Sequence, residues 1–84
     1  MYWNVTKVEL KEGFILFVKF ADGTSGHVKF LKEFFTGVFE PFKNPDLFKQ
    51  VFIAYGTITW PGELDIAPDA MYQEIKNHGE WILS

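Results

Sequence analysis

Alternation of apolar and polar residues marks the first third of the chain. Residues 5–10 place Thr6, Val8 and Leu10 on one face and Val5, Lys7 and Glu9 on the other, which predicts a β-strand. Residues 14–20 are rich in β-branched and aromatic side chains, and residues 24–30 alternate again. Because Asp22-Gly23 separates these two runs, we expect them to form a β-hairpin.

The length of the hairpin loop decides which side chains share a face. A two-residue loop at Asp22-Gly23 would mix apolar and polar residues on each face. A three-residue loop over residues 21–23, with Gly23 in the left-handed conformation, keeps the apolar residues together. We therefore expect one apolar face made of Phe14, Leu16, Val18, Phe20, Gly26, Val28 and Phe30.

The opposite face of this hairpin is only half polar. It carries Ile15, Phe17, Lys19, Ser25, His27 and Lys29. The sequence favours coverage of Ile15 and Phe17 by another element of the fold. The alternative is that Ile15, Phe17 and His27 form a surface for a partner or for a second subunit.

Residues 31–49 combine helical turns with apolar side chains. Residues 31–36 predict one helical turn, and the segment VFEPF after Gly37 predicts an irregular stretch that fills the core. Asn44 is a good N-cap and Pro45 suits the first helical position, so a short helix over residues 45–49 is expected, with Phe48 buried.

Two further strands are predicted over residues 51–55 and 57–60, around a tight turn near Gly56. Their alternation places Ile58 and Trp60 inward. The same alternation places Thr57 and Thr59 outward.

The last part of the chain predicts a helix. Pro68 suits the first helical position, and the helix is expected to run to about residue 77 and to end at Gly79. Ala70 or Met71, together with Ile75, would face the sheet. The expected fold is therefore α+β, with a small antiparallel sheet of about five strands and two short helices packed on one face.

Length and composition limit the function classes. The 84 residues allow a single domain, and the absence of cysteine excludes a disulfide framework. The net charge is −3 and every basic residue is lysine, so we do not expect this domain alone to bind nucleic acid. No stretch approaches the roughly 18 apolar residues of a membrane span, and we expect a soluble, cytoplasmic protein.

Trp3 and Trp81 lie near the two ends, where they would clamp the ends against the domain or meet a second subunit.

Candidate chemistry is concentrated in one loop. Glu63, Asp65 and Asp69 could hold a cation or act as an acid and base pair, but capping of the following helix explains such carboxylates better. Trp60 and Tyr72 could stack a flat ligand, although core packing is the favoured interpretation. The sequence contains no metal, phosphate-loop or nucleophile motif, so neither an enzyme nor a cofactor is expected.

Several short motifs occur in a recognisable order. They are Phe20-Ala21-Asp22-Gly23, Gly26, Gly37-Val38-Phe39, Phe48, Thr59-Trp60-Pro61, Asp65, Pro68 and Tyr72. This order resembles the domain-of-unknown-function family 2442, small bacterial proteins. The resemblance covers nearly the whole chain. It implies a small α+β fold, often encoded beside toxin-like partners, and it implies no activity and no catalytic residues.

Two functions follow as expectations. The first is a non-catalytic interaction module of the accessory or antitoxin-like kind. It would bind a protein partner or itself through Ile15, Phe17 and His27 or through an unpaired strand edge. The alternative is a small-ligand or metal-binding protein, or a weak enzyme, that uses the loop around Glu63 and Asp65 with Asp69. Its candidate residues are Trp60, Glu63, Asp65 and Tyr72.

Overall fold

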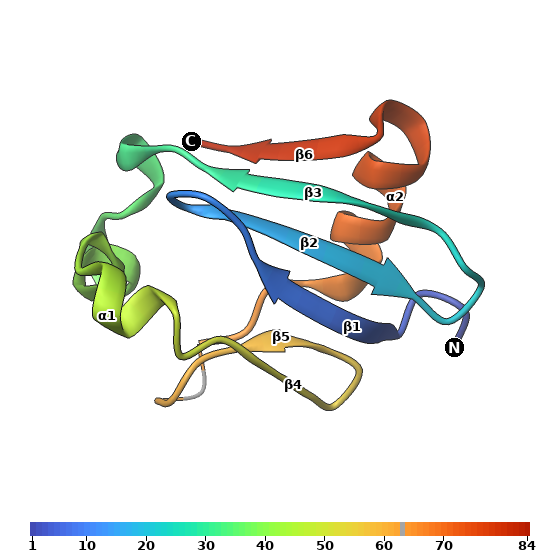
Figure 1. Ribbon diagram of the computed structural model, residues 1–84, viewed down its shortest axis with the longest axis horizontal. Coiled ribbons are helices and arrows are strands. Elements are labelled where there is room, and N and C mark those ends of the chain that lie inside the picture. The colour runs from blue at the N-terminus through green and yellow to red at the C-terminus, as the bar shows by residue number, and fades with distance from the viewer. Residues whose placement is uncertain (63) are drawn as a thin grey trace.

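Six strands in two sheets form the framework of the structure, a computed structural model that describes residues 1–62 and 64–84 (Figure 1). In these residues the larger sheet has the strand order β1-β2-β3-β6, and the smaller pairs β4 with β5. The strands are β1 (Val5–Leu10), β2 (Ile15–Phe20), β3 (Ser25–Phe30), β4 (Phe52–Ala54), β5 (Thr57–Thr59) and β6 (Glu80–Leu83). The expected α+β class is confirmed.

The β2–β3 hairpin has the predicted register. Leu16 lies opposite Val28 and Val18 opposite Gly26, which leaves residues 21–23 as a three-residue loop. Gly23 adopts φ +91°, the left-handed conformation that this loop requires. The inner face of the hairpin is accordingly buried, and it forms the floor of the core.

A β-bulge changes the faces of β1. Val5 lies opposite Phe20 and Val8 opposite Val18, so two residues of β1 stand against the single Lys19 of β2. The extra residue turns both valines toward the core, where Val5 is buried and Val8 partly buried. The predicted alternation, which separated Val5 from Val8, is wrong because the period of two fails at the bulge.

The last strand, β6, was not expected from the sequence. It runs parallel to β3, with Trp81 opposite Val28 and Leu83 beside Phe30, so the larger sheet is mixed rather than wholly antiparallel. Trp81 packs against the core from this strand, and Trp3 does so from the other end of the chain. Both terminal tryptophans therefore hold the chain ends against the domain.

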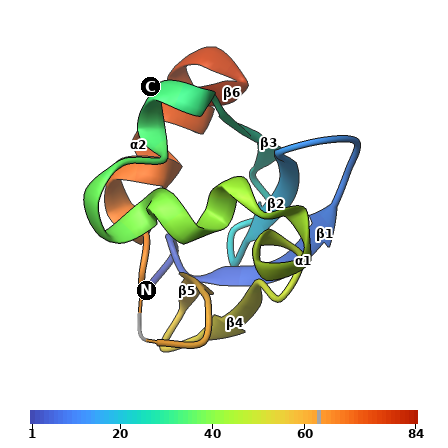
Figure 2. The ribbon, with the colours of Figure 1, turned by 90° about the vertical axis from the view of Figure 1, so that its left-hand side faces the viewer.

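Helical segments cover the inner face of the sheet and close one end of it (Figure 2). They are the 3₁₀ helices η1 (Lys32–Phe34) and η2 (Gly37–Lys43) and the α-helices α1 (Pro45–Phe48) and α2 (Pro68–His78). Helix α1 begins as predicted, because Asn44 Oδ1 accepts a hydrogen bond from the Asp46 amide at 2.9 Å. Helix α2 ends at Gly79, which adopts φ +78°. No helix in residues 1–62 and 64–84 is long and apolar enough to cross a membrane.

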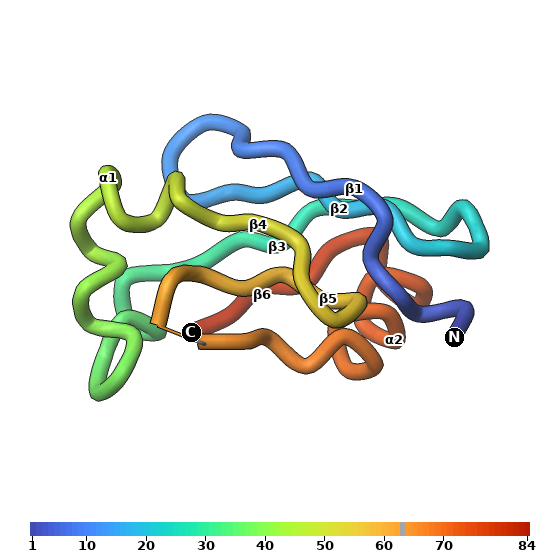
Figure 3. The backbone as a smooth tube through the Cα atoms, turned by 90° about the horizontal axis from the view of Figure 1, so that it is seen from below, coloured from blue at the N-terminus to red at the C-terminus, as the bar shows by residue number. Residues whose placement is uncertain are grey.

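The β4–β5 hairpin extends from the edge of β1 toward α2 and closes the core on that side (Figure 3). Ile58 is buried as expected. Thr57 and Thr59 are also buried, which contradicts their predicted outward position. The reason is that the chain after β5 folds back over the second face of the strand, where the Ile66 amide donates to the Ile58 carbonyl and the Thr57 hydroxyl donates to the Ile66 carbonyl.

Candidate functional site

Three residues expected on the outer face of the sheet lie together there. Phe17 stands opposite His27, and their rings meet edge to face with centroids 5.6 Å apart. Ile15 shares their face because it lies two residues from Phe17 on β2. Among the described elements none lies over this face, since α2 is on the opposite side (Figure 2). The expectation that another element covers Ile15 and Phe17 is therefore wrong, and strand neighbours alone leave them half-buried.

The structure adds Ile82 to this face. It lies opposite Lys29 in the β3–β6 register and is 50% exposed. The sequence analysis missed it because β6 was not predicted. We call Ile15, Phe17, His27 and Ile82 the outer patch.

Charged side chains lie around and within the outer patch. Lys7 Nζ lies 3.1 Å from a Glu9 carboxylate oxygen, and Lys11 Nζ lies 5.6 Å from the centroid of the Phe17 ring. Lys29, which stands between Ile15 and Ile82 in the strand register, places its Nζ 2.9 Å from a Glu80 carboxylate oxygen. With Lys19, the frame holds four lysines and two glutamates, so its net charge is +2 in a chain of net charge −3.

The structure assembles the predicted loop site only in part: Trp60 and Asp65 line the same cleft, and Tyr72 is not part of that lining. Trp60 is 1% exposed, and its indole N–H donates to the Phe48 carbonyl at 2.8 Å. Tyr72 is buried on α2, where its ring meets Phe20. Both are core residues, as favoured from the sequence, and neither offers an open face for a flat ligand. Glu63 lies outside the described residues.

The two described carboxylates near α2 differ in what they contact. Asp69 Oδ1 accepts a hydrogen bond from the Ala70 amide at 2.9 Å. Ala67 is the N-cap of α2, and no side chain among the described residues caps it. Asp65 is exposed and forms no hydrogen bond or ion pair with another described residue, so its expected capping role is wrong. Residues 1–62 and 64–84 contain no group of three or more His, Cys, Asp or Glu that could hold a metal ion.

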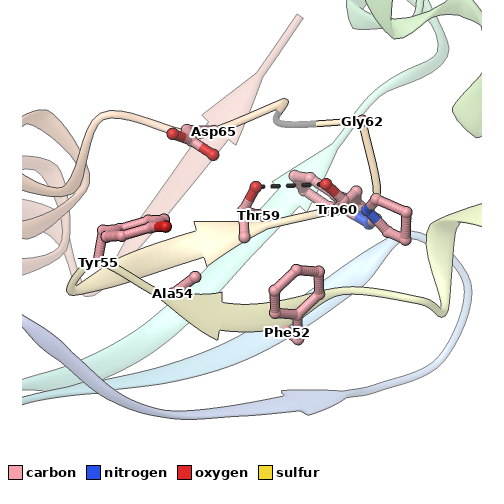
Figure 4. A pocket seen from close by; sticks show the side chains of 8 residues that line it. Phe52, Ala54, Tyr55, Thr59, Trp60, Gly62 and Asp65 are labelled. Atoms are coloured by element: carbon pink, nitrogen blue, oxygen red, sulfur yellow. Dashed lines mark hydrogen bonds between the residues drawn. The ribbon is translucent and has the colours of Figure 1, made fainter.

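A cleft opens between the β4–β5 hairpin and the chain that follows it (Figure 4). Its volume is about 500 Å³, and Asp65 stands on its rim. Tyr55, in the turn of the hairpin, is 98% exposed and has φ +54°. The lining residues are Phe52, Ala54, Tyr55, Thr59, Trp60, Pro61, Gly62 and Asp65. From the sequence Phe52 and Tyr55 were treated only as strand residues, and the placement of Tyr55 directly before Gly56 was the available hint.

Comparison with known proteins identifies the family. The model described as "Protein of unknown function (DUF2442)" matches residues 5–77 of the 84-residue chain. The chain belongs to the DUF2442 family. This confirms the resemblance found in the sequence. No curated protein and no solved structure matches the chain.

Two of the residues that suggested the DUF2442 family meet in the structure. The Tyr72 hydroxyl on α2 donates a hydrogen bond of 2.5 Å to Asp22 Oδ2 in the hairpin loop, and Asp22 Oδ1 accepts from the Thr24 amide at 2.9 Å. These two hydrogen bonds lower the pKa of the Asp22 carboxyl below its usual value. The Asp22 carboxylate in turn raises the pKa of the Tyr72 hydroxyl. In this DUF2442 protein the pair ties the hairpin loop to the helix that covers the sheet.

The Asp22–Tyr72 pair is expected to limit stability at both ends of the pH range. The folded-state pKa of Asp22 lies below the unfolded value of 3.8, so its contribution is present above that pH and is lost as the pH falls through the folded-state pKa. The folded-state pKa of Tyr72 lies above the unfolded value of 10.0, so its contribution is present below that pH and is lost as the pH rises.

Urea unfolding of the wild type and of Tyr72→Phe over a series of pH values measures this effect. The difference in unfolding free energy between the two proteins should be greatest between the two limits and should shrink toward each of them. Tyr55→Phe is the control, because the exposed Tyr55 should leave the profile unchanged. A difference that stays constant with pH would show that the Tyr72 hydroxyl is not bonded to an ionised Asp22.

Proposed function

We propose that this DUF2442 protein is a non-catalytic module that binds an acidic protein partner through the outer patch. The observation that carries the proposal is an uncovered, half-apolar sheet face framed by lysines in a chain that is acidic as a whole. Exposed apolar side chains with a charged rim are typical of protein interaction sites.

The charge of the frame favours an acidic partner over a second copy of the chain. In a two-fold symmetric dimer a surface of net charge +2 would meet an identical surface of net charge +2, which is unfavourable. An acidic surface would instead pair with the lysines while its apolar residues cover Phe17 and Ile82. Glu9 and Glu80 lie within the frame and would repel the phosphates of a nucleic acid.

The non-catalytic part of the proposal is supported by what the histidines contact. His27 meets a phenylalanine ring, and His78 Nε2 lies 3.5 Å from a Glu74 carboxylate oxygen at the exposed end of α2. Neither imidazole forms a hydrogen bond to a hydroxyl group among the described residues, as an activated nucleophile would require. A binding role also agrees with the accessory or antitoxin-like context that the family resemblance suggests.

Substitutions on the patch should abolish capture of the partner. Phe17→Ser and Ile82→Ser remove apolar area from its centre and its β6 side, and each should weaken binding at least about tenfold if the side chain anchors the interface. Affinity purification from the source cell, compared between wild type and variants, measures this loss. Binding should also weaken as salt is raised, because the lysine frame contributes by charge.

The matched control is Val38→Ser. Val38 is 67% exposed and lies in η2, at the end of the molecule and away from the outer patch. Circular dichroism of each variant verifies that the fold is kept. A captured protein that is retained by Phe17→Ser and Ile82→Ser, or lost equally with Val38→Ser, would contradict the proposal. If sedimentation shows that the wild type is a dimer and that Phe17→Ser is a monomer, the patch binds a second copy of the chain and not an acidic partner.

A further inference from the structure

The cleft beside the β4–β5 hairpin is a second recessed surface, and it does not overlap the outer patch. Its floor is formed by Ala54 and Thr59, and the rings of Phe52 and Tyr55 stand on either side of Ala54 (Figure 4). Asp65 lies on the chain segment across the cleft from the hairpin. A small floor between two rings leaves room for a ligand group to enter.

The two-residue turn of the β4–β5 hairpin explains the positive φ of Tyr55, but it does not explain why a tyrosine stands there. A tyrosine at φ +54° is strained by about 1 kcal/mol or more relative to glycine or asparagine, the residues that two-residue hairpin turns favour. Its side chain is 98% exposed, so burial of this side chain contributes almost nothing to stability. Strain of this kind is often retained at binding sites. The structure thus presents a large aromatic ring to solvent at a cost in stability.

The chemistry of the cleft is that of a site for an organic cation. The faces of Phe52 and Tyr55 carry the negative part of the aromatic quadrupole, which attracts alkylammonium groups. Asp65 adds a carboxylate that has no ion pair among the described residues. We propose that this cleft binds an alkylammonium group, held against the rings of Phe52 and Tyr55 and paired with Asp65.

Other ligand classes fit the cleft less well. A divalent cation needs several oxygen ligands, whereas Asp65 is the one carboxylate among the described lining residues. An anion would be repelled by Asp65. A neutral aromatic ring could enter between Phe52 and Tyr55 but would leave the carboxylate without a partner. An alkylammonium group would contact both aromatic rings and pair with the Asp65 carboxylate.

Choline and its neutral carbon isostere, 3,3-dimethylbutan-1-ol, test the proposal directly. On the ¹⁵N-labelled full chain, choline should shift the amide signals of Ala54, Tyr55, Thr59 and Asp65 with millimolar affinity, as expected for exposed cation–π contacts. The isostere has the same shape without the charge and should bind at least about fivefold more weakly. N-acetyl-lysine methylamide, which represents a lysine side chain of a protein, is titrated in parallel with choline, which represents a free quaternary amine. The cation with the lower dissociation constant shows which of the two kinds of ligand the cleft prefers.

Two variants locate the site. Asp65→Asn should weaken choline binding about fivefold or more without changing the fold, because the amide keeps the shape and removes the charge. Tyr55→Asn should abolish binding and at the same time raise the melting temperature, because asparagine tolerates the left-handed conformation. This gain in stability excludes unfolding as the cause of the lost binding.

Three results would overturn the proposal. Equal shifts with choline and the isostere would show that the charge is not recognised. Shifts that map outside the cleft, or that persist in Asp65→Asn and Tyr55→Asn, would place the binding elsewhere. The absence of amide shifts with both cations at millimolar concentration would show that the cleft does not bind alkylammonium groups.

Discussion

Replacing Trp60 by alanine is expected to cost about 3 to 5 kcal/mol of unfolding free energy, the largest effect that we predict for a single substitution in this chain. Trp60 is almost fully buried, and its ring lies 4.9 Å from that of Phe42, 5.8 Å from that of Phe48 and 6.0 Å from that of Phe30. Alanine would leave a cavity among these rings. A domain of this length is stable by only about 4 to 13 kcal/mol, so the variant should be partly unfolded or close to it.

Thermal and urea unfolding measure the Trp60 effect. A decrease in melting temperature of about 15 to 30 °C is expected for the alanine variant. Trp60→Phe separates the ring from its hydrogen bond, because it keeps an aromatic side chain but leaves the Phe48 carbonyl without the indole donor, at a cost of about 1 to 3 kcal/mol.

Trp81→Ala is the matched tryptophan control for this experiment. Trp81 lies on β6 and is only partly buried, so its removal should cost less than half as much as that of Trp60. Equal costs for the two tryptophans would contradict the central place of Trp60 in the core.

Replacing Gly26 by alanine is expected to cost about 3 kcal/mol, the upper part of the range for overpacked cores. A Cβ atom at this position would lie 2.5 Å from the Gly79 carbonyl oxygen and 2.6 Å from Ile75 Cγ2. One of these atoms belongs to the backbone at the end of α2, so the helix itself would have to move away from β3. Gly26 is therefore a position at which the C-terminal end of α2 lies too close to β3 for a side chain.

Urea unfolding of Gly26→Ala and of its neighbour Ser25→Ala measures this contact. Ser25 is exposed at the start of β3, and its replacement should change the unfolding free energy by less than about 0.5 kcal/mol. Ile75→Ala combined with Gly26→Ala should not restore stability, because the contact with the Gly79 carbonyl remains. A Gly26→Ala protein as stable as the wild type would show that α2 does not lie on β3 as described.

The sequence was most informative where local chemistry alone decides the structure. The left-handed Gly23 set the length of the hairpin loop and hence its register. Asn44 with Pro45 defined the start of α1, and Pro68 with Gly79 defined both ends of α2. In each case a side chain or a backbone preference acts within a few residues, so the pattern can be interpreted without the rest of the fold.

The errors share a different origin. Thr57 and Thr59 are polar and alternate with Ile58, which suggested an exposed face, yet the chain after β5 folds back to cover them. The strand β6 is short and pairs with β3 across more than forty intervening residues, and no local pattern reports such a partner. The cleft required the hairpin turn and Asp65 to meet, which their separation in the chain does not reveal.

By itself the sequence determined the class of the fold, the family, the hairpin register and the aromatic nature of the core, because these depend on composition, periodicity and turn residues. Only the tertiary structure decided which faces remain open. It left Phe17 and Ile82 uncovered, buried Thr57 and Thr59, and brought Phe52, Tyr55 and Asp65 into the lining of one cleft. Exposure depends on what packs against a residue from elsewhere in the chain, and that information arises only when distant segments come together.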